Sequence, residues 1–262
     1  MLSHLKVKKS KISKFVLMPG DPGRVDDIGK KLKNFKIIAN NREFRTGVGI
    51  YKGMKITVCS TGIGCPSTAI ATEELIDAGA KYLIRVGTCG GGWRKDVKLG
   101  SLIIPTASIR DEGTTLEYIP QGFPAIANLE IINALSKSAK QKRVLAFTGI
   151  NRTHDAFYGS LDSITRWGKY LTEKRWTKYD TPILSSEMES ASLFIIATLR
   201  GVKAGAIFAV NGNPEPLRKR LNGKSQKVIT EENQKISEEI INTTIDIALE
   251  ACAELYQHSF PD

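Results

Sequence analysis

The chain has 262 residues, of which 41% are hydrophobic and 25% charged, and its formal net charge is +11. These values are typical of a globular protein and exclude disordered and fibrous chains. A strongly basic chain can bind nucleic acid. Here the lysines are spread along the sequence without the aromatic pattern of a nucleic-acid module, so we expect solvated surfaces and no nucleic-acid partner.

The few cysteines and histidines indicate a cytoplasmic protein without zinc. The cysteines contain no C-x-x-C pair, which predicts reduced thiols, and the three histidines lack metal-ligand spacing. We identify no signal peptide, and the most apolar stretch, Ala191 to Val210, is interrupted by Arg200 and Lys203. We therefore expect no membrane partner.

The first predicted elements are a strand at Phe15–Met18 and a helix to about Leu32. Asp21 is suited to cap this helix, because Pro22 follows at the first helical position. Apolar alternation then predicts three strands, the last two joined by a hairpin at Lys52-Gly53. These strands are Phe35–Ala39, Phe44–Tyr51 and Lys55–Ser60.

The rest of the chain alternates between the two kinds of element. Helices are predicted at Pro66–Ala78, Leu129–Lys140, Glu189–Leu199 and about Glu231–Tyr256. Strands are predicted at Tyr82–Val86, Leu102–Ile109, Val144–Ile150, Pro182–Ser186 and Ala204–Val210. Since no repeat or linker divides the chain, we predict a single domain over residues 1–262, a three-layer α/β/α fold with a mixed central sheet. Ligands of such sheets bind at the C-terminal ends of strands.

Three arginines lie in or beside predicted turns. Arg24 closes a Gly-Asp-Pro-Gly turn, Arg42 lies between two strands, and Arg85 ends a strand before the predicted turn Gly87-Thr88-Cys89-Gly90. Guanidinium groups, turn amides and the Thr88 hydroxyl are the donors that a phosphate needs. Each arginine alone could make a surface salt bridge, but the three together favour a phosphate site.

A pair of carboxylates, in Glu187-Met188-Glu189, lies where a strand meets a helix. Glutamate at a helix start commonly complements the helix dipole. Alternatively, one carboxylate binds sugar hydroxyls while Met188 packs against the sugar ring. The tripeptide alone leaves both interpretations open.

Five motifs together resemble the nucleoside phosphorylase family, in its hexameric purine and uridine branch. They occur in the family's order over nearly the whole chain, and the core motifs are most similar to uridine phosphorylases. They are Gly20-Asp21-Pro22-Gly23-Arg24, Asn41-Arg42-Glu43-Phe44, Ser60 to Ser67, Arg85 to Gly90 and Glu187 to Ala191. The resemblance implies a pentosyltransferase that reversibly cleaves the N-glycosidic bond of a ribonucleoside to give free base and ribose 1-phosphate. Uridine is the ribonucleoside that the resemblance favours. Inorganic phosphate is the co-substrate, and no cofactor is required.

The resemblance also implies the site residues. The catalytic residues would be Arg24, Arg85 and Glu189. Phosphate would bind Gly20, Arg24, Arg85 and Thr88, with Arg42 from a neighbouring subunit. Ribose would bind Thr88, Met188 and Glu189, with His4 from the neighbour. The base would contact Phe157, Ser160, Asp162, Glu187 and Asn211. A potassium ion could bind Glu43, Ile63 and Ser67 at a dimer interface. Sites shared in this way imply a homo-oligomer with a dimer as its smallest active unit, and we expect a hexamer built as a trimer of dimers.

The base-reading positions depart from both branches of the family. Uridine phosphorylases have Gln-x-Arg where this chain has Ser160 and Asp162, and purine phosphorylases have a proton-donating aspartate where it has Asn211. An amide can donate a hydrogen bond but cannot deliver a proton. Asp155 or Asp162 could act instead, and His154 could face the base. The core motifs favour uridine, and a purine nucleoside is the alternative.

Two further functions remain as alternatives. A nucleosidase would use water in place of phosphate, and the three retained arginines argue against it. A non-catalytic protein that binds nucleosides or nucleic acid could have kept the fold after losing its base site. The changed base-reading residues and the high positive charge motivate that second alternative.

Overall fold

The strands in the described part of the protein form one mixed sheet. The computed structural model describes residues 1–91, 94–158, 181–212 and 231–259. In this part of the chain the sheet order is β10-β6-β8-β9-β5-β1-β4-β3-β2, with the short β7 paired to β6. The strands are β1 (Phe15–Met18), β2 (Lys33–Asn41), β3 (Phe44–Tyr51), β4 (Met54–Cys59), β5 (Tyr82–Gly90), β6 (Leu102–Asp111), β7 (Ala125–Ile126), β8 (Ala146–His154), β9 (Ile183–Glu187) and β10 (Lys203–Gly212).

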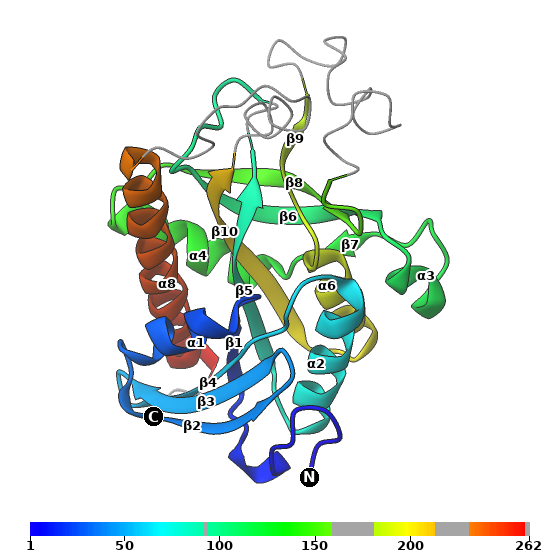
Figure 1. Ribbon diagram of the computed structural model, residues 1–262, viewed down its shortest axis with the longest axis vertical. Coiled ribbons are helices and arrows are strands. Elements are labelled where there is room, and N and C mark those ends of the chain that lie inside the picture. Colours follow the sequence, from blue (N-terminus) through cyan, green and yellow to red (C-terminus); the bar gives the residue numbers. More distant parts are fainter. Residues whose placement is uncertain (92–93, 159–180, 213–230, 260–262) are drawn as a thin grey trace.

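Five of these strands close into a ring. β10 pairs with β6 and also, in parallel, with β5, so that β5, β10, β6, β8 and β9 form a closed circuit. The remaining strands β1, β4, β3 and β2 extend from β5 and carry the blue lower part of Figure 1. Closure gathers the C-terminal ends of β5, β9 and β10 in one place, because Gly90 of β5 pairs with both Ser186 and Gly212.

Helices cover both faces of the sheet. α2 packs against α6 on one side, and α8 packs against α4 on the other (Figure 1). The predicted α/β fold with a mixed sheet is therefore confirmed. The helical elements are η1 (Lys9–Lys11), α1 (Pro22–Gly29), α2 (Cys65–Asp77), α3 (Thr114–Tyr118), α4 (Leu129–Gln141), α6 (Ser190–Leu199) and α8 (Glu231–Ser259). Among the described helices, none has the length and apolarity needed to cross a bilayer.

Local chemistry explains how α1 begins and ends. The Asp21 side chain accepts a hydrogen bond from the Gly23 N–H at 2.9 Å, and Pro22 occupies the first turn, as predicted. The helix ends at Gly29, three residues before the predicted boundary. The amides of Lys31 and Leu32 bond to carbonyls three residues back, which is the tighter pattern of a turn.

The predicted turn at Gly87 to Gly90 is wrong, because these residues belong to β5. They pair with β10, with Gly87 opposite Phe208 and Cys89 opposite Val210. Their partner strand lies more than one hundred residues along the chain, so local sequence gave no sign of it. The donors of Arg85 and Thr88 are thus held on a strand and not in a loop.

Candidate active site

A cavity of about 980 Å³ opens at the C-terminal ends of the strands, where ligands of such sheets were expected. Residues from seven segments line it, and most of the predicted site residues are among them. The lining residues are Gly20, Asp21, Pro22, Arg24, Glu43, Gly62, Ile63, Arg85, Thr88, Cys89, Gly90, His154, Phe157, Tyr158, Ser186, Glu187, Met188, Glu189, Asn211 and Gly212.

Three predicted residues in the described part of the chain are not in this wall, and two more cannot be placed. Ser160 and Asp162 lie outside the described residues. Ser67 does not line the cavity, and neither do His4 and Arg42, both of which are exposed. The Asn41 side chain donates a hydrogen bond to the His4 carbonyl at 2.7 Å, which holds the N-terminal segment beside the turn that carries Arg42. His4 and Arg42 therefore belong to one surface region of the chain, separate from its own cavity.

Two guanidinium groups, those of Arg24 and Arg85, share the cavity wall. Burial lowers the pKa of Arg24, and the positive charge of Arg85 acts in the same direction, while Asp21 and Asp27 oppose them. Two neighbouring cations in a partly buried wall are stabilised when an anion lies against both. The geometry therefore suits an anionic ligand such as phosphate.

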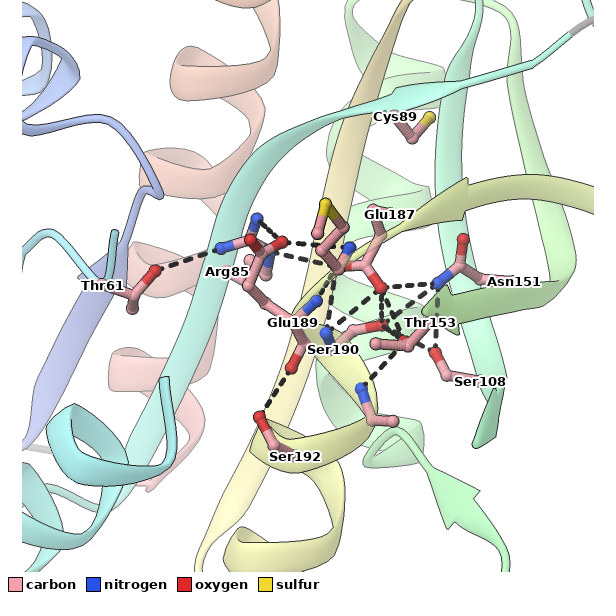
Figure 2. A network of polar contacts seen from close by, with 12 residues as sticks. Thr61, Arg85, Cys89, Ser108, Asn151, Thr153, Glu187, Glu189, Ser190 and Ser192 are labelled. Atoms are coloured by element: carbon pink, nitrogen blue, oxygen red, sulfur yellow. Dashed lines mark hydrogen bonds and ion pairs between the residues drawn. The ribbon is translucent and has the colours of Figure 1, made fainter. Parts of the chain in front are cut away.

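The Glu189 carboxylate is held beside Arg85, as Figure 2 shows. It forms an ion pair with Arg85 and accepts hydrogen bonds from the backbone N–H of Gly64 at 2.8 Å and of Met188 at 3.2 Å. Burial raises the pKa of Glu189 and the charge of Glu187 adds to the effect, while Arg85 opposes it. Glu189 precedes the first residue of α6, Ser190, so the predicted helix start is one residue early.

The second carboxylate, Glu187, has a different environment from the one expected for a base contact. It lines the cavity, but both of its oxygens accept hydrogen bonds from inside the protein (Figure 2). The donors are Asn151 Nδ2 at 2.9 Å, Thr153 Oγ1 at 2.7 Å, Ser190 Oγ at 2.7 Å, Ser190 N at 2.9 Å and Glu189 N at 3.0 Å. Arg85 Nε also lies 3.3 Å away. These contacts leave the carboxylate little capacity to bind a nucleobase.

The remaining part of the wall combines aromatic and polar side chains. The Phe157 and Tyr158 rings meet edge to face with centroids 5.2 Å apart, and Asn211 lies at the end of β10. His154 Nδ1 and Ser186 Oγ are buried and have no hydrogen-bond partner within the described part of the chain. Burial lowers the pKa of His154 to about 4, so its imidazole is neutral near pH 7.

Sequence reasoning missed the residues that support the two carboxylates. Gly64 lies within a recognised motif, but its N–H had no assigned role. Asn151 and Thr153 were placed beyond the predicted end of a strand, whereas they belong to β8. The sequence carried little signal, because the four residues from Asn151 to His154 are all polar. Only once they are known to lie in a strand do Asn151 and Thr153, two residues apart, share one face of the sheet.

The three residues predicted to bind potassium lie around Gly62. A Cβ atom at Gly62 would be 2.8 Å from Glu43 Cβ and 3.5 Å from Ser67 Oγ, and Ser67 Oγ lies 3.3 Å from the Ile63 carbonyl oxygen. Carboxylate, hydroxyl and carbonyl oxygens are hard ligands and fit an alkali cation.

The chain is similar in sequence and in fold to known proteins. A family model described as the phosphorylase superfamily matches residues 14–246. The uridine phosphorylase of Treponema pallidum is 40% identical over 213 residues, covering 80% of this chain and 81% of that protein. The guanosine phosphorylase of Halorubrum lacusprofundi is 36% identical, with 80% and 83% covered. The crystal structure of uridine phosphorylase from Vibrio fischeri matches with a TM-score of 0.81, 31% identity and 97% of each chain covered.

Proposed function

Because the chain belongs to the phosphorylase superfamily, we propose that it is a nucleoside phosphorylase that cleaves uridine with inorganic phosphate to uracil and ribose 1-phosphate. The family predicted from the five motifs is thereby confirmed. Similarity to two uridine phosphorylases supports uridine as the substrate. The transferred group is a pentose, so the enzyme is a pentosyltransferase.

The observation that carries this function is the placement of Arg24, Arg85 and Glu189 in one wall of the cavity. Two guanidinium groups suit a phosphate, and an adjacent carboxylate suits the vicinal hydroxyls of ribose. Gly20 and Thr88 lie in the same wall and would add a close backbone approach and a hydroxyl. Met188 would pack beneath the sugar, and Phe157 against the base or sugar.

The reaction then needs no covalent bond to the protein. A phosphate oxygen forms a bond to C1′ while the C1′–N bond breaks, and the leaving base keeps that electron pair and takes up a proton from solvent. Positive charge develops on the ribose in the transition state. Phosphate held by Arg24 and Arg85 lies next to that charge, so catalysis is mostly positioning and electrostatic stabilisation.

Charge balance supports a contribution from a second subunit. The wall contains two arginines, Arg24 and Arg85, and four acidic residues, so one chain offers a phosphate dianion no net positive charge. The acidic residues are Asp21, Glu43, Glu187 and Glu189. Arg42 from a neighbouring subunit would supply another cation, and His4 beside it would bind the ribose 5′-hydroxyl. We therefore infer a homo-oligomer in which a dimer is the minimum active unit, arranged as a hexamer of three dimers.

Two finer assignments complete the proposal. A potassium ion would bind Glu43, Ile63 and Ser67 and neutralise carboxylate charge where two subunits meet. The enzyme would be cytoplasmic, which the four free, buried thiols support.

A purine nucleoside is the second candidate substrate. Similarity to a guanosine phosphorylase favours it, and so does Asn211, whose amide lies in the wall and can hydrogen-bond a purine N7.

A phosphorolysis screen tests both candidates. The purified protein would be incubated with uridine, thymidine, inosine, guanosine and adenosine, with and without phosphate, and free base would be measured. We expect phosphate-dependent release of uracil faster than release of any purine. Inosine or guanosine turnover above that of uridine would establish the purine alternative. Equal turnover without phosphate would indicate a nucleosidase and refute the proposal.

A further inference from the structure

We propose that Asn151 and Thr153 are positioning residues that act through Glu187 to hold the Arg85 guanidinium where it binds phosphate. The inference rests on the proposed function only in taking Arg85 as a phosphate ligand. It assigns to Glu187 a role inside the protein, in place of contact with the base.

The pairing of β8 with β9 brings these side chains together. Asn151 lies opposite Ser185 and Thr153 opposite Glu187, so all four project from the same face of the sheet. Figure 2 shows Asn151, Thr153 and Glu187 converging on the first turn of α6, where Ser190 completes the cluster. Asn151 and Thr153 are fully buried, and Glu187 is 5% exposed.

The two oxygens of Glu187 face different groups. Oε1 accepts from Asn151 at 2.9 Å and from Thr153 at 2.7 Å, which ties it to β8. Oε2 accepts from the Glu189 N–H at 3.0 Å and lies 3.3 Å from Arg85 Nε. Rotation of the carboxylate away from Asn151 and Thr153 would therefore also move the group that faces Arg85.

The orientation of the Asn151 amide is itself determined by its neighbours. Its Oδ1 accepts from the Ser185 hydroxyl at 2.8 Å, and its Nδ2 lies 3.1 Å from Ser190 Oγ and 3.3 Å from Ser108 Oγ. A flip of the amide would place an oxygen against the Glu187 carboxylate, where two acceptors repel, whereas the Ser185 hydroxyl can bond to either orientation. Asn151 is therefore held with its donor toward Glu187.

Arg85 depends on Glu187 at one end of its guanidinium. Its Nε is buried and makes no hydrogen bond within the described residues, so the Glu187 carboxylate at 3.3 Å is its charge partner. The other nitrogens contact Glu189 and, at 3.5 Å, the Thr61 hydroxyl. A buried charge is costly unless it is fully hydrogen-bonded. The hydrogen bonds to Glu187 from Asn151, Thr153 and the Glu189 N–H therefore keep its carboxylate charged beside Arg85.

The test compares two variants of Thr153. Thr153→Val removes the hydroxyl and keeps the size of the side chain, whereas Thr153→Ser keeps the hydroxyl. Binding of inorganic phosphate to the assembled protein would be measured by calorimetry, and KM for phosphate and kcat by phosphorolysis. We expect Thr153→Val and Asn151→Leu to weaken phosphate binding about tenfold, the usual effect of losing a hydrogen bond to a charged group. Thr153→Ser should bind as the wild type does.

Thr244→Val is the matched control for loss of a buried hydroxyl. Thr244 is 1% exposed, and its hydroxyl donates to the Ile240 carbonyl within α8, outside the cavity wall. We expect it to bind phosphate normally. An equal loss of phosphate binding in Thr244→Val would indicate general destabilisation and overturn the proposal.

The outcomes separate this inference from the proposed function. If Thr153→Val folds and binds phosphate as the wild type does, the positioning role is overturned. The two Thr153 variants decide this even if Asn151→Leu fails to fold. Wild-type protein that binds phosphate but cleaves no nucleoside would refute the proposed function. The positioning role would then still be judged by the phosphate affinities. Absence of phosphate binding in the wild type would overturn both.

Discussion

At the scale of single residues, Arg85 holds the centre of the site because it contacts both carboxylates. Its side chain is 5% exposed and lies between Glu187 and Glu189. Burying this ion pair costs desolvation free energy, which the surrounding hydrogen bonds offset. The interaction with Glu189 also keeps the Arg85 guanidinium on the cavity side, where Arg24 adds a second positive charge.

His154 provides a prediction of pH dependence. Burial lowers its pKa to about 4, below the unfolded value of about 6.5, so the folded protein binds fewer protons than the unfolded chain between these values. The free energy of unfolding should therefore fall as the pH drops from about 6.5 to about 4. This residue should account for up to about 3 kcal/mol of the loss.

The comparison is with His154→Asn, which cannot titrate. Urea unfolding of both proteins would be measured at a series of pH values between about 4.5 and 7.5. We expect the wild type to lose more stability on acidification than the variant. Parallel pH profiles for the two proteins would show that the histidine does not stay neutral in the folded state.

At the scale of elements, the loop between β4 and α2 connects the two halves of the site. The Gly62 N–H donates to the Gly20 carbonyl at 2.9 Å, and the Gly64 N–H donates to Glu189. Both glycines have positive φ, +73° and +98°. Only a residue without a Cβ adopts this backbone readily, so the loop needs glycine to reach the carboxylate.

Gly62→Ala and Gly53→Ala form a matched pair that tests this requirement. Gly53 also has positive φ, at +83°, but a Cβ there would meet nothing within 4 Å. At Gly62 a Cβ would lie 2.7 Å from Glu43 Cγ. We expect Gly53→Ala to lose about 1 kcal/mol of unfolding free energy with normal kinetics. Gly62→Ala should lose more and should raise KM for the nucleoside. Equal effects of the two substitutions on stability and kinetics would contradict this expectation.

The types of the longer elements were predictable from sequence, whereas strand ends and the short η1, α3 and β7 were not. α4 and α6 begin within one residue of their predicted positions, because caps and apolar periodicity are local signals. β8 extends four residues past its predicted end, through Asn151 to His154. Those residues are polar and break the apolar pattern. They are in the sheet because Ser108 to Asp111 of β6 pair with them.

At the scale of the whole molecule, the exposed Arg42 becomes informative. It lies outside the cavity of its own chain, next to the segment that carries His4. If it serves a neighbour's site, Arg42→Ala and Arg24→Ala damage different parts of each shared site. Each variant alone should then lose most of its activity.

Mixed oligomers of these two variants provide the test. In a mixed dimer one site carries both lesions and the other carries neither. Random assembly makes half of the dimers mixed, so co-refolding should restore about a quarter of wild-type activity. Activity that stays at the level of the separate variants would refute sharing of Arg42 between subunits. Mixtures with Arg85→Ala provide the control. Arg42→Ala mixed with Arg85→Ala should also restore activity, because the two lesions again fall in one site of each mixed dimer. Arg24→Ala mixed with Arg85→Ala should not, because each site then carries one lesion.

The sequence by itself determined the order of the longer helices and strands, though not the short η1, α3 and β7. It also determined the family and most of the polar groups that line the cavity, because motifs and periodicity are local properties of the chain. Tertiary structure alone decided how those groups pair. Ring closure turned a predicted turn at Gly87 into part of β5. Arg85 and Glu189 are 104 residues apart, and Glu187 and Asn151 are 36 apart. Contacts across such separations arise from strand register and closure of the sheet, which no local pattern encodes.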